Sequence, residues 1–377
     1  MQKTNNLSHC IEPERLNSIL PILYLCLFIF LVTSAKAQLK GKNAPGQTYT
    51  NPVLNTIFAD PAVIKAPDGW YYAYATRTWH EEKEMIHLQV ARSRDLVHWD
   101  YLPDAMPVKP FWADSTTEFW APDIQYDADS KTYYLYIASG HNGSREHCIG
   151  VLTSSSPTGP FTDMGKPLVC GPGYTHIDPM VFQDPKTGRR YILWGSDHAP
   201  IQMQEMKGWT QLKPGSKPID LLLPTKKQNN YDNMIEGPWL IYTKGYYYLF
   251  FSGDNCCGPK SHYAVMVARA KKITGPYEKF KGVDGSGNGV ILELNSHFDA
   301  PGHNAVITTN NGKQYWMLYH AIDPKDRFQS KKSPVGMTFD KRVLLLDQIT
   351  FKDGWPRIKD NSPSFVPRPA PVPDNPE

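Results

Sequence analysis

Short runs of hydrophobic and aromatic residues recur along the chain, and the same order of runs returns about every sixty residues. Each unit starts with a short apolar strand after a Pro, Gly or Asn turn, followed by another turn and an aromatic strand. No long stretch keeps the 3.6-residue period of an amphipathic helix. The predicted first strands cover residues 60–64, 121–125, 178–182, 236–241 and 303–307, and the aromatic second strands cover 70–75, 133–138, 191–194, 246–251 and 315–319.

Five such units predict a single all-β domain, a five-bladed β-propeller. A unit of three or four antiparallel strands cannot bury both of its faces alone, whereas radial stacking buries them and protects the edge strands. A β-sandwich or a jelly roll is the competing fold, but neither explains five copies of one strand order. We place the propeller at residues 51–360, between a polar lead-in at 38–50 and a Pro-rich tail at 361–377 that we expect to be extended and mobile.

The N-terminal region predicts export. An apolar run at 20–32 follows two basic residues and precedes the small-x-small site Ala35-Lys36-Ala37, which is typical of a secretory signal peptide covering 1–37. A signal anchor is the alternative, but the run is short for a transmembrane span. We therefore expect a secreted or periplasmic protein that has no membrane insertion after cleavage.

Composition narrows the class of partner. A hydrophobic fraction of 41% with 20% charged residues excludes a disordered chain. The net charge of +3, without a basic stripe, argues against nucleic acid, whereas 10 Trp and 21 Tyr suit stacking on carbohydrate. We expect a monomer. The four cysteines beyond the signal segment do not have zinc-site spacing, and the sequence does not specify their pairing: Cys148, Cys170, Cys256 and Cys257.

The predicted fold brings three carboxylates to one mouth. In a propeller the first strand of every blade lines the central channel, so the starts of the five strands meet at one opening. The residues at these starts are Asp60, Ala121, Asp178, Glu236 and His303. Paired carboxylates that flank a bond are the equipment of glycoside hydrolysis, and a third carboxylate raises the pKa of the acid.

The loops after the second strands frame the same opening and form a polar, aromatic rim. They include Trp79, His80 and His320. Trp120 directly precedes the second blade's first strand and is placed to stack on a sugar, although packing in the core is an equal alternative. Trp79 and His80 have the same two interpretations, and His320 has the alternative of capping its blade.

The ordered motifs resemble those of glycoside hydrolase family 43, the five-bladed arabinanases, arabinofuranosidases and xylosidases. They span residues 55–358 in the family's order. The matching segments are Ala59-Asp60-Pro61-Ala62-Val63, Trp120-Ala121-Pro122-Asp123, Ile177-Asp178-Pro179, Ile235-Glu236-Gly237-Pro238, Gly302-His303-Asn304 and Asp353-Gly354-Trp355-Pro356.

The resemblance implies a role for each matched residue. Asp60 would be the general base, Glu236 the general acid, and Asp178 the carboxylate that orients Glu236 and raises its pKa, in an enzyme that inverts the anomeric carbon. Arg342 would meet the ring hydroxyls of the substrate. His303 would face Ca²⁺, another ion or a water cluster beneath the substrate, and no cofactor would be required.

The predicted function is therefore that of a secreted inverting glycoside hydrolase acting on plant cell-wall polysaccharide, arabinan or arabinoxylan. The resemblance favours an endo-α-1,5-L-arabinanase. An exo-acting α-L-arabinofuranosidase or a β-xylosidase is the alternative, because the loop 224–234 and the Cys256-Cys257 pair depart from the arabinanase pattern. A non-catalytic sugar-binding propeller is the alternative of another class, and the presence of all three carboxylates counts against it.

Overall fold

The computed structural model describes residues 46–80, 84–116, 118–282, 285, 287–328 and 340–374. The predicted signal peptide and residues 38–45 of the predicted lead-in lie outside these residues. Within them, no helix is long and apolar enough to cross a bilayer.

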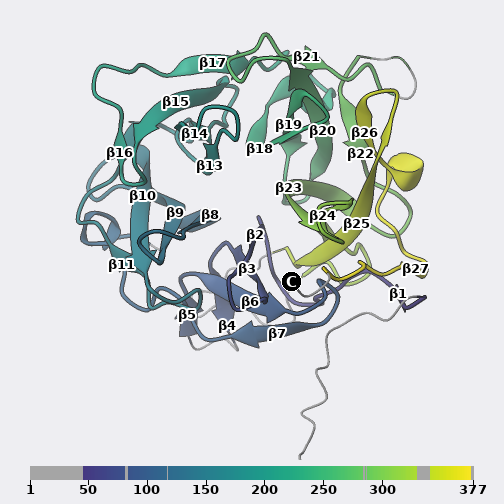
Figure 1. Ribbon diagram of the computed structural model, residues 1–377, viewed down its shortest axis with the longest axis horizontal. Coiled ribbons are helices and arrows are strands. Elements are labelled where there is room, and N and C mark those ends of the chain that lie inside the picture. The colour runs from purple at the N-terminus through teal and green to yellow at the C-terminus, as the bar shows by residue number, and fades with distance from the viewer. Residues whose placement is uncertain are drawn as a thin grey trace, which may run out of the picture. The chain divides into compact units, whose positions relative to one another are not determined.

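Five antiparallel sheets surround a common centre, which confirms the predicted five-bladed propeller (Figure 1). The innermost strands are the predicted first strands, namely β2 (Ala62–Lys65), β8 (Phe119–Asp127), β13 (Met180–Gln183), β18 (Glu236–Thr243) and β23 (Asp299–Thr309). Each pairs with the aromatic strand that follows it in sequence, namely β3 (Tyr71–Ala75), β9 (Thr132–Gly140), β14 (Arg190–Trp194), β19 (Tyr246–Asn255) and β24 (Gln314–Ile322).

The outer part of each blade is built from a third strand and its partners. The third strands are β6 (Gln89–Ser93), β10 (Glu146–Ser154), β15 (Ile201–Lys207), β20 (His262–Ala270) and β25 (Arg342–Lys352). In blades 1 and 5 the partner is a single strand, β7 (Trp99–Leu102) or β26 (Trp355–Ile358). In blades 2, 3 and 4 two short strands share the edge: β11 (Thr162–Asp163) with β12 (Val169–Pro172), β16 (Gln211–Leu212) with β17 (Ile219–Leu222), and β21 (Glu278–Lys279) with β22 (Val290–Leu292).

A few short elements lie outside the blades. The hairpin β4 (Thr78–His80) and β5 (Glu84–Ile86) sits in the connection between β3 and β6. Three 3₁₀ turns, Phe111–Ala113, Tyr231–Asn233 and Lys359–Asn361, are the helical elements of the described residues.

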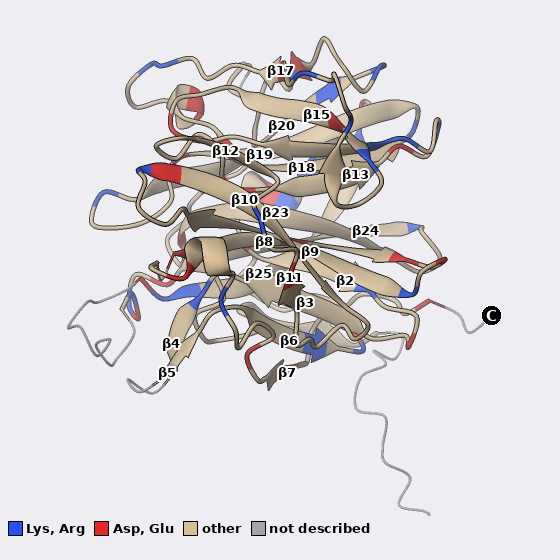
Figure 2. Ribbon diagram, turned by 90° about the vertical axis from the view of Figure 1, so that its left-hand side faces the viewer, with Lys and Arg blue, Asp and Glu red and all other residues tan. Residues whose placement is uncertain are grey.

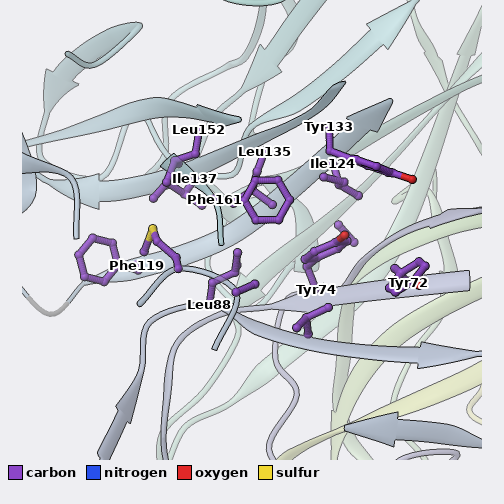
Figure 3. Close-up of a cluster of buried hydrophobic side chains, with 14 of the residues drawn as sticks. Tyr72, Tyr74, Leu88, Phe119, Ile124, Tyr133, Leu135, Ile137, Leu152 and Phe161 are labelled. Atoms are coloured by element: carbon purple, nitrogen blue, oxygen red, sulfur yellow. The ribbon is translucent and has the colours of Figure 1, made fainter. Parts of the chain in front are cut away.

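The core lies between neighbouring blades. Every residue of β3 is buried, because both faces of its blade are covered. Figure 3 shows the cluster between blades 1 and 2, where Tyr72 and Tyr74 of β3 lie near Leu135 of β9 and Phe161. Trp239 of β18 packs against four of the hydrophobic clusters, so its indole joins the blades near their common centre.

The ring closes where the segment before β2 meets blade 5. The backbone N–H of Val53 donates to the carbonyl of Leu344 at 3.0 Å, and that of Phe58 donates to the carbonyl of Arg342 at 2.8 Å. These bonds extend the edge of blade 5 with residues that lead directly into blade 1. They therefore place Asp60, two residues after Phe58, next to β25.

The Pro-rich tail differs from its prediction as a mobile segment. Strand β27 (Arg368–Pro369) of the tail pairs with β1 (Thr48–Tyr49) of the lead-in. Tyr49 is buried and its hydroxyl donates to the carbonyl of Leu346 in blade 5 at 2.7 Å. Buried apolar contacts and strand pairing thus hold the described part of the tail on the propeller.

Viewed from the side, acidic and basic residues are both scattered along the ribbon (Figure 2).

Candidate active site

The first strands share a backbone conformation where they begin. The residue before each Pro, or before Asn304 in blade 5, is left-handed, with φ of 57° at Asp60, 44° at Ala121, 59° at Asp178, 59° at Gly237 and 49° at His303. This conformation costs a non-glycine residue about 1–3 kcal/mol and is concentrated at functional sites.

The shared conformation corrects the predicted alignment of blade 4. The left-handed residue of blade 4 is Gly237, which therefore aligns with Asp60 and Asp178. Glu236 stands one position earlier. A Cβ on Gly237 would lie 3.2 Å from Nδ1 of His303. Glycine is therefore required there both by φ and by the approach of the imidazole.

Polar residues at the ends of the second strands accept hydrogen bonds from the backbone of these left-handed residues. The N–H of Ala121 donates to Oγ1 of Thr76 at 2.9 Å, and the N–H of Asp60 donates to Nδ1 of His320 at 3.1 Å. The N–H of His303 likewise donates to Oγ of Ser252 at 2.8 Å. In each case the second strand of one blade binds the first residue of the next blade.

Asp60 has the surroundings of an ionised carboxylate. Its Oδ2 accepts a hydrogen bond from Thr76 at 2.6 Å, and its Oδ1 accepts one from Nη1 of Arg342 at 2.9 Å. Burial acts to raise the pKa of Asp60, but Arg342, His303 and His320 outweigh it and hold this pKa well below its usual range. Asp60 is therefore charged at neutral pH and can accept a proton.

Glu236 has the opposite character. Its Oε1 accepts a hydrogen bond from the hydroxyl of Tyr263 at 2.7 Å, and its Oε2 accepts one from Ser196 at 2.7 Å. Burial raises the pKa of Glu236, and the charge of Asp60 raises it further, although the two hydroxyl donors oppose the rise. Glu236 is therefore the carboxyl suited to hold a proton for donation.

Asp178 lies between the two and is linked to Glu236 through the backbone. Its Oδ2 accepts a hydrogen bond from the N–H of Gly237 at 3.0 Å, which fixes the peptide that follows Glu236. Burial and the charges of Glu236 and Asp60 raise the pKa of Asp178 well above its usual range. Asp178 and Glu236 thus titrate as a pair, in which the negative charge of either favours protonation of the other.

His303 borders both aspartates. Its Nδ1 lies 3.5 Å from Oδ1 of Asp60 and 3.8 Å from Oδ2 of Asp178. Burial lowers the pKa of His303 despite the nearby charge of Asp60, so the imidazole is neutral at neutral pH. Among the described residues, no group of three His, Cys, Asp or Glu side chains could hold a metal ion. The ion that the resemblance implies near His303 stays a prediction.

His320 is placed differently from its prediction as a substrate contact. Its side chain is completely buried and stacks on Tyr263, with ring centroids 5.8 Å apart. Burial lowers the pKa of His320 to about 4, so it stays neutral and supports the backbone of Asp60 from below. It acts on the site through Asp60.

Thr76 and Tyr263 belong to the site although the sequence did not single them out. Thr76 carried a signal, because polar residues also end the other aromatic strands, as at Ser196, Ser252 and His320. No sequence signal marked Tyr263, because it resembles the other aromatic residues of the predicted strands.

A central pocket opens over the carboxylates and encloses about 330 Å³, which lies in the range of small-ligand sites. It is lined by Asp60, Trp120, Tyr174, Ile177, Asp178, Glu236, Cys256, Cys257, His303 and Arg342. The indole of Trp120 stacks on His147 at 5.2 Å, and His147 stacks on Tyr174 at 4.6 Å. The stack forms an aromatic wall in the pocket, and contact of Trp120 with a sugar stays a prediction.

Two further pockets adjoin the central one. The blade 1 pocket shares Trp120, Cys257 and Arg342 with it and is otherwise lined by Ile57, Ala59, Thr76, Arg77, Thr78, Gly258, Pro259, Phe328 and Asp340. The blade 2 pocket shares Tyr174 with it, and its polar lining includes Glu118, His141, Glu146 and His147. A ligand chain could therefore extend from the central pocket into either of these pockets.

The two remaining predicted rim residues lie in the β4–β5 hairpin. Trp79 is half-buried and is not among the residues that line the three pockets described above. His80 ends β4, and the placement of its side chain lies outside what the structure describes.

Comparison with known proteins gives one family for the whole propeller. The model of the family "Glycosyl hydrolases family 43" matches residues 49–356. Among curated relatives, an extracellular endo-α-(1→5)-L-arabinanase of Bacillus subtilis is 29% identical over 324 residues, covering 83% of this chain and 91% of the relative. An extracellular exo-α-(1→5)-L-arabinofuranosidase of Cellvibrio japonicus is 26% identical, covering 80% of this chain and 86% of the relative.

Solved structures agree with this assignment. A thermostable family-43 glycoside hydrolase is 26% identical and superposes with a TM-score of 0.67, covering 86% of this chain and 99% of the other. The native Bacillus subtilis arabinanase Arb43A is 27% identical with a TM-score of 0.60, covering 83% of this chain and 100% of the other.

Proposed function

The chain belongs to glycosyl hydrolase family 43 and is a glycoside hydrolase, and we propose that it is an inverting, endo-acting α-1,5-L-arabinanase. The observation that carries the mechanism is the contrast between two carboxyl groups in one pocket. Arg342 and Thr76 stabilise Asp60 as a carboxylate, whereas burial raises the pKa of Glu236 and so favours its protonated form. These are the two states that acid and base need before the reaction starts.

The reaction proceeds in one displacement. Asp60 takes a proton from a water molecule, and the water oxygen forms a bond to the anomeric carbon. The bond from this carbon to the leaving oxygen breaks, and Glu236 gives its proton to that oxygen. Attack on the face opposite the leaving group inverts the anomeric carbon.

The other residues position these two groups. Asp178 binds the N–H of Gly237 and so fixes the backbone next to the acid. Neutral His303 and the guanidinium of Arg342 line the pocket and are available to the hydroxyl groups of the sugar, while Trp120 offers its face to the ring.

Endo action is supported by the two pockets that adjoin the central one and by the relatives that are named as endo-arabinanases. A second candidate, exo-acting arabinofuranosidase, is favoured by the relative from Cellvibrio japonicus. The two are separated by the products formed early from linear arabinan. We expect a mixture of oligosaccharides and greater activity on the polymer than on aryl arabinofuranoside or aryl xyloside. Release of arabinose alone, or preference for the xyloside, would contradict the proposal.

Export of the enzyme fits a polymeric substrate outside the cell. Relatives of the chain are named extracellular, and residues 1–37 have the pattern of a signal peptide. N-terminal sequencing of the exported protein should start near Gln38. A mature chain that retains residues 20–35 would contradict cleavage.

A further inference from the structure

Two adjacent cysteines line the central pocket. Cys256 and Cys257 are disulfide-bonded to each other and follow β19 in blade 4. Both line the pocket that contains Asp60, Asp178 and Glu236, and Cys257 also lines the adjoining blade 1 pocket. The catalytic scheme above gives this pair no role.

The segment that carries the pair is fastened to blade 5. The guanidinium of Arg327 donates to the carbonyl of Gly258 and to Oγ of Ser261, and its Nε lies 3.3 Å from Oδ1 of Asp340. The N–H of Gly258 donates to the same Asp340. The peptide that follows the disulfide is therefore held by a charged network that lies away from the carboxylates.

The disulfide also packs against residues that support Glu236. Cys256 packs against the cluster of Tyr263, Ala300 and Ile322, and the hydroxyl of Tyr263 donates to Glu236. The position of the disulfide is thus set by two groups of contacts: those of Cys256 with the buried Tyr263 cluster, and those of Gly258 with Arg327 and Asp340.

We propose that the Cys256–Cys257 disulfide is an apolar wall of the sugar-binding pocket and that it determines affinity for the glycan. The inference rests on the proposed function. A furanose ring has hydroxyl groups that need polar partners and carbon-bound hydrogens that need an apolar surface, and the pocket is lined by residues of both kinds. Bonded sulfur atoms have no hydrogen-bond donor and are polarizable, so they provide such a surface from blade 4, as Trp120 does from blade 2. Joining the two side chains also leaves them little freedom to lose when the sugar binds.

Reduction should therefore weaken binding more than it slows the chemical step. Dithiothreitol delivers two electrons and two protons in successive thiol–disulfide exchanges, leaving two thiols and a cyclic oxidised reagent. The freed side chains can turn away from the sugar and expose S–H groups. Loss of a small apolar contact in a binding pocket reduces binding by about tenfold or more.

A background that lacks the other disulfide isolates the effect. Cys148 and Cys170 are bonded to each other between β10 and β12 of blade 2, and neither lines the central pocket. The double variant Cys148→Ala/Cys170→Ala should keep KM near the wild-type value, although its melting temperature should fall. In this background dithiothreitol can reduce only the Cys256–Cys257 pair among the four described cysteines.

The kinetic test measures KM and kcat for arabino-oligosaccharides in that background. We expect dithiothreitol to raise KM about tenfold with a smaller change in kcat. Adding Cys256→Ser/Cys257→Ser should reproduce the high KM and remove the response to dithiothreitol. An unchanged KM after reduction, or a fall in kcat alone, would contradict the proposal that the disulfide determines affinity for the glycan. Circular dichroism of each variant checks that it folds.

Two chemical readouts keep this test separate from the proposed substrate. Alkylation of the denatured, unreduced protein should leave Cys256 and Cys257 unmodified, and free thiols there would overturn the proposal. Arabino- or xylo-oligosaccharides should slow the reduction of this pair in the Cys148→Ala/Cys170→Ala background. Protection by xylo-oligosaccharides alone would support contact of the disulfide with the bound sugar while contradicting the arabinanase assignment. Protection by neither sugar would overturn the proposed contact.

Discussion

Residues with the same functional group behave differently in this pocket because their neighbours differ. Asp60 receives a guanidinium and a hydroxyl, so its charged form is stabilised and its pKa is lowered. Glu236 receives only hydroxyl donors, and burial raises its pKa. One carboxyl is thus ready to accept a proton while the other is ready to give one.

The role of the acid can be tested through the leaving group. A general acid contributes typically ~10²–10⁴-fold when the leaving oxygen needs a proton, and little when an acidic phenol departs unaided. Glu236→Ala should therefore lose most activity on arabinan but retain far more on an activated aryl arabinofuranoside. Asp60→Ala should lose activity on both, because water must be activated in either case. The measurement is kcat/KM on both substrates, with circular dichroism as the control for folding. The reverse pattern would exchange the two roles.

Asp178 should control the alkaline side of the pH profile. The acid must be protonated, so activity falls as pH rises through the pKa of Glu236. Asp178 and Glu236 titrate as a coupled pair, so the charge that Asp178 takes up as pH rises favours the protonated acid, and Asp178→Asn removes this coupling while retaining a similar shape. The pKa of Glu236 should fall, and the alkaline limb of kcat/KM should move to lower pH with a reduced maximum. A limb that stays in place would show that Asp178 has a purely structural role.

At the scale of elements, the site depends on where strands begin and end. Thr76, Ser252 and His320 lie at or near the ends of the second strands, and each side chain accepts a hydrogen bond from the backbone N–H of the left-handed residue in the next blade. A shift of one residue in any strand would break this contact and turn the neighbouring carboxylate away from the pocket. Strand register is therefore part of the catalytic geometry.

Closure of the ring gives a stability prediction at this scale. The buried side chain of Asn51 accepts a hydrogen bond from the N–H of Leu346 and donates to the carbonyl of the same residue and to Ser364. Asn51→Ala would leave the buried N–H of Leu346 without its partner, at about 1–3 kcal/mol, while the carbonyl of Leu346 keeps the hydroxyl of Tyr49. We expect a lower urea midpoint, with kcat/KM under native conditions near wild type. Asn230→Ala is the control, because Asn230 is exposed and its φ of −96° suits alanine. An unchanged midpoint for Asn51→Ala would contradict this account of closure.

The order of the blades could be predicted from sequence because each blade repeats a local signal, an apolar strand followed by an aromatic one. The register at Glu236 could not, since the exceptional residue is a glycine, and its left-handed conformation and its approach to the imidazole of His303 exist only in the folded ring. The burial of His320 and the pairing of β1 with β27 were also missed. Both arise from contacts between parts of the chain that are distant in sequence.

At the scale of the whole molecule, the active site exists only in the closed ring. Asp60 comes from blade 1, Asp178 from blade 3, Glu236 from blade 4 and Arg342 from blade 5. Blade 5 lies between the blades of the base and the acid, so these two carboxyls approach the substrate from blades that are not neighbours. Inverting enzymes hold the pair roughly 6.5–9.5 Å apart, which leaves room for a water molecule.

The stereochemistry of the first product tests this account most directly. Proton NMR of the early reaction on an α-L-arabinofuranoside resolves the two anomers before they interconvert. If Asp60 activates water opposite the leaving group, the β-anomer must appear first and the α-anomer later by mutarotation. Initial release of the α-anomer would mean a covalent intermediate, and Asp60 could not be the general base.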